Sequence, residues 1–293
     1  MKNFVFSTTR SLLCEVGSSQ RLGDLFQSLG CQRGQRLLLI TDHGIHSRQL
    51  DKKCIQNLEQ TGYEVLVYSG VTADPPEQNI LEAVELSKSQ NICGVIGFGG
   101  GSSMDVAKLV AFLSNKDCQQ SLSEIYGVGN CVGNRLPLIQ VPTTAGTGSE
   151  VTPISIVTTG ASEKKGIVSS QLLPDWAVLD GELTLSLPVP TTAATGIDAM
   201  VHAIEAYTTR LKKNPLSDIL AKEALTLLGS NIRKVCSPTG SQDPHARGAM
   251  LLGSMYAGMA FANAPVGAVH ALAYPIGTHF HVPHGLSNSL MLP

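Results

Sequence analysis

In Gly94-Val-Ile-Gly-Phe-Gly-Gly-Gly-Ser-Ser-Met-Asp-Val-Ala-Lys108, a short apolar run passes directly into three glycines and then into a helical pattern. An uninterrupted apolar run of this length is typical of a strand that is buried on both faces of a parallel sheet. Glycines let the backbone approach a ligand closely, and a helix that begins near Ser103 points its free N–H groups and the positive end of its dipole at the turn. The stretch therefore predicts a strand, a turn and a helix that bind a diphosphate.

The glycine spacing alone is weak evidence, because it matches neither the G-x-G-x-x-G pattern nor the P-loop pattern. A plain strand–turn–helix unit, whose glycines serve only packing, is the alternative. The position directly after a buried strand favours the phosphate interpretation, because ligands of open α/β sheets bind beyond the carboxyl ends of the strands. The candidate contacts are Gly99, Gly100, Gly101, Ser102 and Ser103.

Similar apolar runs occur on both sides of this unit, and helical patterns separate them. The predicted strands cover residues 36–41, 64–68, 94–98 and 138–141. The predicted helices cover residues 22–29, 48–61, 80–90 and 104–114. Strands joined by helices of this length form parallel βαβ units. Residues 1–185 are therefore predicted to form a doubly wound, mostly parallel, Rossmann-like α/β domain.

The second part of the chain has only helical patterns. After a connector with two prolines at residues 183–190, helices are predicted over residues 191–209, 215–235 and 244–262. Each begins with a good N-terminal signal, namely Thr191 or Thr192, Asn214-Pro215 and Asp243-Pro244. We therefore expect residues 186–293 to form an all-helical domain.

Composition argues against several classes of function. The 293 residues include 21 basic and 23 acidic ones, with no basic stripe of the kind that binds nucleic acid. The seven cysteines are scattered and form no C-x-x-C pair, which favours reduced thiols in a cytoplasmic protein. The N-terminus shows no signal peptide. We expect a cytoplasmic protein without a nucleic-acid partner.

One stretch needs to be checked as a membrane span, because residues 248–293 contain no Asp, Glu, Lys or Arg. A spanning helix needs about 20 apolar residues, and this run reaches Asn263 and Pro265 before that. Its glycines and alanines suit close helix packing. We therefore predict a core helix at residues 246–262 and no membrane partner.

Two polar segments follow other predicted strands. The carboxylate of Asp42, at the end of the first strong strand, can accept hydrogen bonds from a ribose and repel a 2′-phosphate. A role as a helix cap or turn residue is an equally good interpretation. The loop Thr143-Thr-Ala-Gly-Thr-Gly-Ser-Glu-Val-Thr152 suits cofactor hydroxyls and amides, whereas an ordinary surface loop would not explain its apolar flanks.

Aspartate and histidine residues of the second half suggest a metal site. Asp198 and His202 are four residues apart and share one helix face, although an intrahelical hydrogen bond would explain this pair equally well. Four of the eight histidines fall in an uncharged segment, at positions 270, 279, 281 and 284, where buried imidazoles need partners. One carboxylate and three imidazoles suit Fe²⁺ or Zn²⁺ with a position open for substrate. Spacing alone leaves open which late histidines bind.

Taken together, these motifs make the chain resemble the iron-containing (group III) alcohol dehydrogenases, within the broader dehydroquinate synthase-like fold that also includes glycerol dehydrogenase. The resemblance covers essentially the whole chain and rests on four motifs in the correct order: Gly99-Gly-Gly-Ser-Ser-Met-Asp-Val-Ala-Lys108, Pro142-Thr-Thr-Ala-Gly-Thr-Gly-Ser-Glu150, Gly196-Ile-Asp-Ala-Met-Val-His-Ala-Ile-Glu-Ala-Tyr207 and Pro283-His-Gly285.

The resemblance implies specific site residues. It places metal ligands on Asp198, His202, His270 and His284, the cofactor diphosphate over residues 99–103, and the adenosine ribose near Asp42. Contacts on the nicotinamide side are implied for Thr143, Thr144, Thr147 and Ser149. Asp105 and Lys108 of the glycine-rich motif complete the cofactor-binding set.

The chain departs from the family pattern in two ways. Many members carry a proton-relaying histidine four residues after the first late ligand, where this chain has Tyr274. A tyrosine with a pKa of about 10 is a poor base near neutrality, so His281 or His279 is the alternative relay. Members also continue through several more helices beyond Pro293. We therefore expect an incomplete helical domain whose exposed apolar faces favour self-association into a homo-oligomer.

The resemblance implies an oxidoreductase that moves a hydride between NAD, less readily NADP, and a small alcohol or its carbonyl compound. The divalent metal would be Fe²⁺, with Zn²⁺ as the alternative. A lyase-type relative such as dehydroquinate synthase needs a basic pocket for its phosphorylated substrate, and the late segment lacks basic residues. An inactive fragment, or one that survives only as a binding module, is the third reading.

Overall fold

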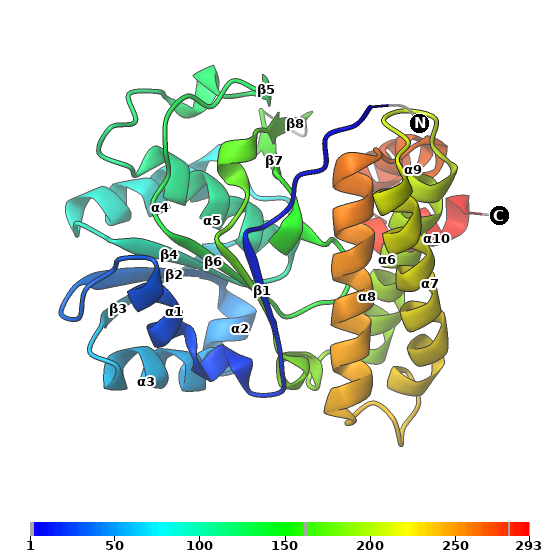
Figure 1. Cartoon of the computed structure of the whole chain (residues 1–293), viewed down its shortest axis with the longest axis horizontal. Helices are drawn as coiled ribbons and strands as arrows, with labels where there is room; N and C mark the ends of the chain where they lie inside the picture. The colour runs from blue at the N-terminus through cyan, green and yellow to red at the C-terminus, as the bar shows by residue number, and fades with distance from the viewer. Residues whose placement is uncertain (1–2, 161–162, 281, 293) are drawn as a thin grey trace.

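The computed structural model describes residues 3–160, 163–280 and 282–292. Within them, an α/β part and a helical part lie side by side (Figure 1). The α/β part ends with a short 3₁₀ helix, η5 (Gly181–Thr184), and the helical part begins with α6 (Val189–Thr208). The predicted fold class is confirmed, and the predicted boundary after residue 185 falls in the link between these two elements.

A six-stranded sheet forms the centre of the α/β part, in the order β1-β9-β6-β4-β2-β3. All of its strand pairs are parallel. Its strands are β1 (Ser11–Cys14), β2 (Arg36–Asp42), β3 (Glu64–Val71), β4 (Gly94–Gly99), β6 (Leu138–Pro142) and β9 (Trp176–Leu179). The four predicted strands are present, while β1 and β9 were not predicted.

Helices cover both faces of this sheet, which explains why its strands are apolar throughout. Alternate residues of β2 point to opposite faces. Leu37 and Leu39 pack with residues of α1 (Leu22–Ser28) and α3 (Lys52–Gln60). Leu38 and Ile40 pack with residues of α4 (Glu77–Ser89) and α5 (Gly101–Leu113).

The helix predicted over residues 48–61 is shorter in the structure, where it is α3, and a short helix that was not predicted, α2 (His43–Ser47), precedes it. Gln49 between them has a positive φ of 58°, which interrupts the helical backbone. Asp42 caps α2, because its carboxylate accepts a hydrogen bond from the Ile45 N–H at 2.9 Å. The polar turn after β2 is thus a short helix whose first residue follows Asp42 directly.

A second, three-stranded sheet was not predicted. It consists of β5 (Gly127–Val128), β8 (Glu163–Val168) and β7 (Ile154–Thr159), with β7 and β8 antiparallel. The backbone N–H of Ile156 in β7 donates to the Asp105 carboxylate at 2.9 Å, which fixes this sheet against the start of α5. Side chains of β7 and β8 therefore lie close to the glycine-rich turn.

In the described part of the chain, five helices form the helical part. They are α6, α7 (Pro215–Val235), α8 (Pro244–Asn263), α9 (Ala268–Phe280) and α10 (His284–Met291). The predicted starts of α7 and α8 are confirmed, with Asn214 and Asp243 as side-chain caps. The predicted core helix is α8, most of whose residues are buried. Among the described residues, no helix is long and apolar enough to cross a membrane.

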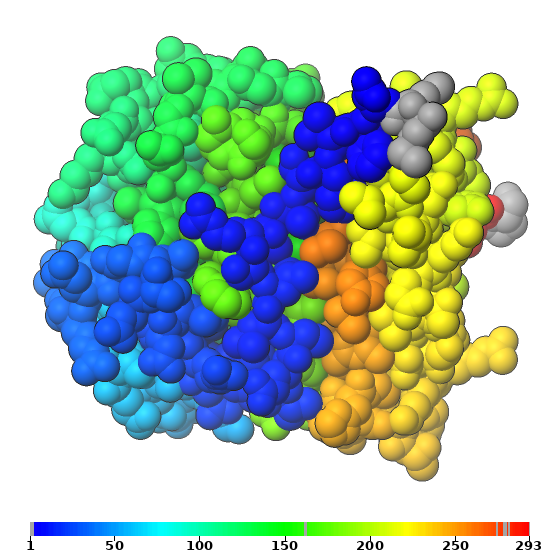
Figure 2. Space-filling view, in the orientation of Figure 1, coloured from blue at the N-terminus to red at the C-terminus, as the bar shows by residue number. Residues whose placement is uncertain are grey.

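The two parts are joined by close backbone packing. Gly258 of α8 lies against Gly148, where an added Cβ would come within 2.8 Å of the Gly148 Cα atom. The N-terminal segment lies across the boundary between the two parts (Figure 2). There the Asn263 side chain makes two hydrogen bonds of 2.8 Å with the Ser7 backbone. Residues from both parts can therefore form the walls of a common site.

Candidate metal and cofactor site

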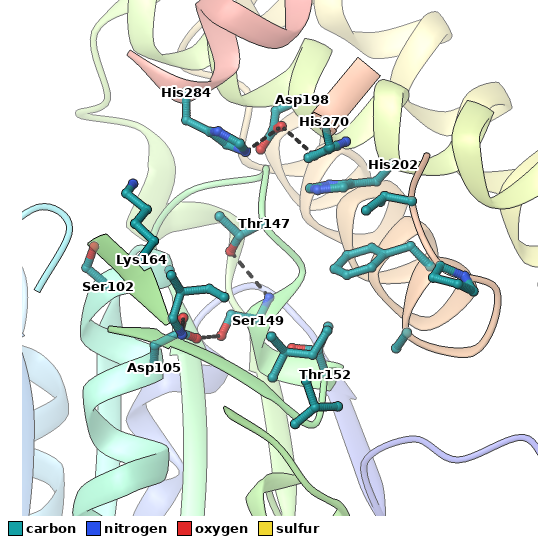
Figure 3. A pocket seen from close by; sticks show the side chains of 18 of the residues that line it. Ser102, Asp105, Thr147, Ser149, Thr152, Lys164, Asp198, His202, His270 and His284 are labelled. Atoms are coloured by element: carbon teal, nitrogen blue, oxygen red, sulfur yellow. Dashed lines mark hydrogen bonds and ion pairs between the residues drawn. The ribbon is translucent and has the colours of Figure 1, made fainter. Parts of the chain in front are cut away.

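A cavity of about 470 Å³ lies between the two parts. One wall carries the aspartate and histidine residues of the helical part, and the opposite wall carries residues of α5, the loop after β6, and β7 and β8 (Figure 3). This cavity brings together the predicted metal ligands and part of the predicted cofactor-binding set.

The four predicted metal ligands meet at one end of this cavity. Asp198 and His202 come from consecutive turns of α6, His270 from the first turn of α9, and His284 from the start of α10. One ligand atom from each of Asp198, His202 and His270 lies within 4.8 Å of the others. The Nε2 atoms of His270 and His284 lie 3.8 and 3.6 Å from the Asp198 Oδ1 atom.

Aromatic packing and burial hold the imidazoles in place. The His202 ring stacks between Phe261 and His270, with centroid distances of 4.4 and 4.6 Å. Burial lowers the pKa of His202 to about 4, despite the opposing effect of the neighbouring Asp198 carboxylate. Burial also lowers the pKa of His284. Neutral imidazoles at neutral pH are the form that binds a metal ion.

The donor set fits a divalent transition metal. One carboxylate and three imidazoles are the ligand types that Fe²⁺ and Zn²⁺ accept. The Nδ1 atom of His202 is buried and makes no hydrogen bond with the described residues. The amide of Asn288 lies beside the other three ligands, with its Nδ2 atom 3.2 Å from the Nε2 atoms of both His270 and His284. The amide N–H donor of Asn288 therefore lies beside the atoms of Asp198, His270 and His284 that would bind a metal ion.

The glycine-rich turn forms part of the opposite wall. Gly99 ends β4 with a positive φ of 152°, and Gly100 caps α5. An added Cβ at Gly101 would come within 2.9 Å of the Thr147 side chain, so only glycine fits without a shift. Gly101 and Ser102 line the cavity at the start of α5, where backbone N–H groups lack helical partners. The turn therefore presents hydrogen-bond donors and a positive helix end to an anion.

The loop after β6 contributes to two cavities. Thr147 and Ser149 line the cavity that holds the ligand cluster. Thr143 lines another cavity of about 400 Å³, together with Asp42. Thr144 lies over the glycine-rich turn, with its Oγ1 atom 3.5 Å from the place of a Cβ at Gly100. The glycine-rich turn therefore lies near both cavities.

Lys108 differs from the rest of the predicted cofactor-binding set. It is fully buried and lines none of these cavities. Its Nζ atom donates to the Ser149 Oγ at 2.7 Å and the Ile154 carbonyl at 2.6 Å, with Thr152 and Asp105 slightly farther away. The ammonium therefore connects α5 to the loop and to β7 beneath the cavity wall. Asp105 itself lines the cavity and accepts a hydrogen bond from the Ser149 hydroxyl at 2.6 Å.

The remaining wall of the cavity is mostly apolar. The apolar lining residues are Pro75, Ile154, Ile156, Val168, Phe261, Ala262, Pro265 and Val266. An ion pair between Lys164 and Asp74 also lines the cavity, at 2.5 Å. The Lys164 side chain extends toward the side of His284 (Figure 3). Burial raises the pKa of Glu150, the loop residue after Ser149, to about 7.

Some predicted residues lie outside what the structure describes. His281 falls outside the described residues, and the side chains of Tyr274 and His279 do so as well. Sequence reasoning assigned no role to Glu205, Phe261 or Asn288, which all contact the ligand cluster. A charged residue one turn after His202, in an otherwise apolar part of the helix, was a usable signal for Glu205. No pattern in the sequence pointed to Asn288.

Comparisons with known proteins agree on one family. A family model described as iron-containing alcohol dehydrogenase matches residues 9–181. A second model, described as the C-terminal domain of the Fe-containing alcohol dehydrogenase family, matches residues 192–293. The chain is 42% identical to long-chain-alcohol dehydrogenase 1 of Geobacillus thermodenitrificans over 88% of its own length, but it spans only 65% of that relative.

Solved structures have the same architecture. A 1,3-propanediol oxidoreductase structure matches with a TM-score of 0.93 and 32% identity, over 100% of this chain and 75% of that one. A sulfoacetaldehyde reductase from Bifidobacterium kashiwanohense, solved in complex with NAD⁺, matches with a TM-score of 0.90 and 27% identity, over 100% of this chain and 76% of that one.

Proposed function

The chain belongs to the iron-containing alcohol dehydrogenase family, and we propose that it transfers a hydride between a nicotinamide cofactor and a small alcohol or its carbonyl compound. The observation that carries this proposal is the cavity of about 470 Å³. One of its walls has the cluster of candidate metal ligands, and the other has the glycine-rich turn, which suits a phosphate group. A substrate in this cavity would lie between the metal ion and the nicotinamide of a cofactor bound over the turn.

Asp198, His202, His270 and His284 would hold the divalent metal, with Fe²⁺ as the proposed ion and Zn²⁺ as the alternative. When bound, the ion would supply Lewis-acid chemistry at the oxygen of the substrate. The chain itself fixes the four ligands from three helices. The stacked rings of Phe261, His202 and His270 keep bulk water from that side of the cluster.

The turn at residues 99–103 would hold the cofactor diphosphate, and the nicotinamide supplies the redox chemistry. Thr147 and Ser149 lie on the cavity side of this turn, where the nicotinamide end would lie. Asp42 lies in the other cavity with Thr143, which is a suitable place for the adenosine ribose. We propose a preference for NAD over NADP, because the Asp42 carboxylate would repel a 2′-phosphate.

The apolar wall of the cavity suits a substrate with an alkyl portion. Ile154, Ile156 and Phe261 would contact the carbon chain and exclude water from the reacting carbon. One similar structure carries the name 1,3-propanediol oxidoreductase, which supports a small alcohol as the substrate. A proton relay through Tyr274 or His281 stays a prediction from the sequence.

Further properties stay proposals. A homo-oligomer and the lack of nucleic-acid partners rest on the sequence alone. All seven cysteines are free thiols in the structure, which supports a cytoplasmic location because disulfides are rare in reducing compartments.

Purified protein assayed with NAD and a short panel of alcohols tests the proposal directly. The assay is run after chelator treatment, and again after addition of Fe²⁺ or Zn²⁺. We expect NADH formation that depends on added metal and is larger with NAD than with NADP. A lack of metal-dependent NADH formation with every alcohol, and with the aldehydes in reverse, would contradict the proposed function.

A further inference from the structure

A buried carboxylate next to the ligand cluster has no part in the proposed chemistry so far. Glu205 lies on α6, three residues after His202, and only 4% of its surface is exposed. Removing a carboxylate from water is costly unless hydrogen bonds or opposite charges compensate. Its partners therefore indicate what the structure gains from this charge.

Both Glu205 oxygens have partners in the first turn of α9. Oε2 lies 2.5 Å from the His270 Nδ1 atom. Oε1 accepts a hydrogen bond of 2.7 Å from the backbone N–H of Val269. A carboxylate at the first turn of a helix is also favoured by the helix dipole. One side chain thus connects α6, which carries two ligands, to the helix that carries the third.

The contact with Nδ1 determines which nitrogen of His270 carries the proton. An ionised carboxylate only accepts hydrogen bonds, so the Nδ1 atom must be the donor. In a neutral imidazole the Nε2 atom then keeps its lone pair. That Nε2 atom is the one that faces the Asp198 Oδ1 atom at 3.8 Å.

We propose that Glu205 is a positioning residue of the metal centre, which fixes the Nδ1–H tautomer of His270 and directs its Nε2 lone pair at the metal. The proposal rests on the metal site proposed above and extends it to a residue outside the ligand set. Partners of this kind raise the basicity of a ligating imidazole and fix its ring orientation. Glu205 acts through His270 and does not contact the substrate.

A purely structural role is the competing explanation. Glu205 could serve only to join α6 to α9, in which case its loss would lower the stability of the protein without changing the proton position on His270. The two explanations therefore differ in the tautomer of His270, and the test must include it.

The test compares the wild-type protein with Glu205→Gln and Glu205→Ala. Glu223→Gln, which changes an exposed glutamate on α7, is the matched control. Zn²⁺ affinity is measured by competition with a chromophoric chelator after metal removal. The tautomer of His270 in the metal-free protein is measured by ¹⁵N NMR with labelled histidine, and the melting temperature of each metal-free variant is recorded.

We expect Glu205→Ala to weaken Zn²⁺ binding by about 10- to 100-fold and to allow both His270 tautomers. Glu205→Gln should have a smaller effect, because its single carbonyl oxygen can still accept one of the two hydrogen bonds. Glu223→Gln should match the wild type. If Glu205→Ala does not fold, the glutamine variant still carries both measurements.

Each of the other outcomes overturns one specific claim. If the wild-type protein takes up no Zn²⁺, the proposed metal site is wrong. If it binds Zn²⁺ and both Glu205 variants bind as tightly, the role of Glu205 is wrong. A lower melting temperature with an unchanged His270 tautomer would leave Glu205 as a structural link between two helices and would likewise overturn the proposal.

Discussion

The two walls of the central cavity differ in how their residues are brought together. On the cofactor wall, the glycine-rich turn and the threonine-rich loop are short continuous segments that follow the neighbouring strands β4 and β6. On the metal wall, four side chains come from α6, α9 and α10, and none of these helices contributes more than two ligands. The first wall depends on local backbone geometry, whereas the second depends on the packing of helices.

The walls also differ in their electrostatics. Beneath the cofactor wall, Lys108 is buried with Asp105 and Glu150 nearby, and burial raises the pKa of Glu150. In the metal wall, burial instead lowers the pKa of His202. The imidazole is therefore neutral at neutral pH and can bind a metal cation. Each wall can therefore be perturbed by changes that leave the other intact.

Lys108→Met should have the largest effect on stability. It removes the ammonium that contacts Ser149, Thr152 and Ile154, and it leaves Asp105 without its buried counter-charge. Breaking one partner of a buried ion pair costs about 3 to 5 kcal/mol in the free energy of unfolding. Urea unfolding measures this loss, and Lys88→Met on the exposed face of α4 is the control. Equal stability of the two variants would show that the network beneath the cofactor wall does not stabilise the fold.

The pH dependence of stability should separate the walls in the chelator-treated protein. The pKa of His202 falls from 6.5 to about 4 on folding. Between these two pH values only the unfolded chain binds the proton, so the free energy of unfolding decreases as the pH falls from 6.5 toward 4. The pKa of Glu150 rises from 4.5 to about 7, so stability is lost as the pH rises through this range. Each contribution amounts to roughly 3 kcal/mol in the free energy of unfolding.

These two contributions oppose each other between about pH 4.5 and about 6.5, where both windows overlap. Melting temperatures of His202→Gln should therefore fall more steeply with rising pH than those of the wild type, and those of Glu150→Gln should rise. Parallel curves for the wild type and both variants would mean that neither group titrates as its burial implies.

Gly101→Ala should weaken the cofactor wall alone. The added Cβ would come within 2.9 Å of the Thr147 side chain, so this side chain or its loop must shift where it meets the start of α5. We expect the KM for NAD to rise about tenfold, equivalent to about 1.4 kcal/mol, with unchanged metal content. Gly229→Ala on α7, where a Cβ would meet nothing within 4 Å, is the matched control. A KM equal to that of the control would place the cofactor elsewhere.

The smallest change is expected for Asp42→Gly, which tests the far end of the cofactor wall. Glycine at a helix N-cap costs only about a few tenths of a kcal/mol compared with aspartate, so α2 should persist. The ratio of kcat/KM for NAD to that for NADP should fall by about tenfold, because the like charge is removed. Asp42→Asn keeps a cap without the charge and should behave in the same way. Equal use of both cofactors by the wild type would rule out this role of Asp42.

Features that depend on local sequence could be predicted, whereas features that depend on the packing of distant segments could not. The strand β2 and the starts of α7 and α8 follow from local signals, namely an apolar run and the caps Asn214 and Asp243. The strands β1 and β9 are neighbours in the sheet, although most of the sequence of the α/β part separates them. Neither strand has a strong sequence pattern of its own. Strand β8 begins Glu163-Lys-Lys, which indicates a surface segment until its antiparallel partner β7 is known.

The candidate site divides in a similar way. The residues of the glycine-rich turn are given by their position after a strand, but the internal bonding of Lys108 depends on a loop and a strand far along the chain. The ligand pair on α6 is visible as a four-residue spacing. The spacing of the late histidines did not show which of them bind the same metal ion as this pair, because their positions depend on the angle between helices. Only the family resemblance selected His270 and His284.

We expect side chains of α6, α9 and α10 to hold one divalent metal ion opposite the cofactor turn. Elemental analysis of the purified, dialysed protein and of its His202→Ala variant tests it most directly, with His245→Ala, which changes an exposed histidine at the start of α8, as control. We expect close to one divalent ion per chain in the wild type and the control, and a loss of stoichiometric metal in His202→Ala. Unchanged metal content in His202→Ala, or a wild-type protein that holds no divalent metal after loading, would contradict it.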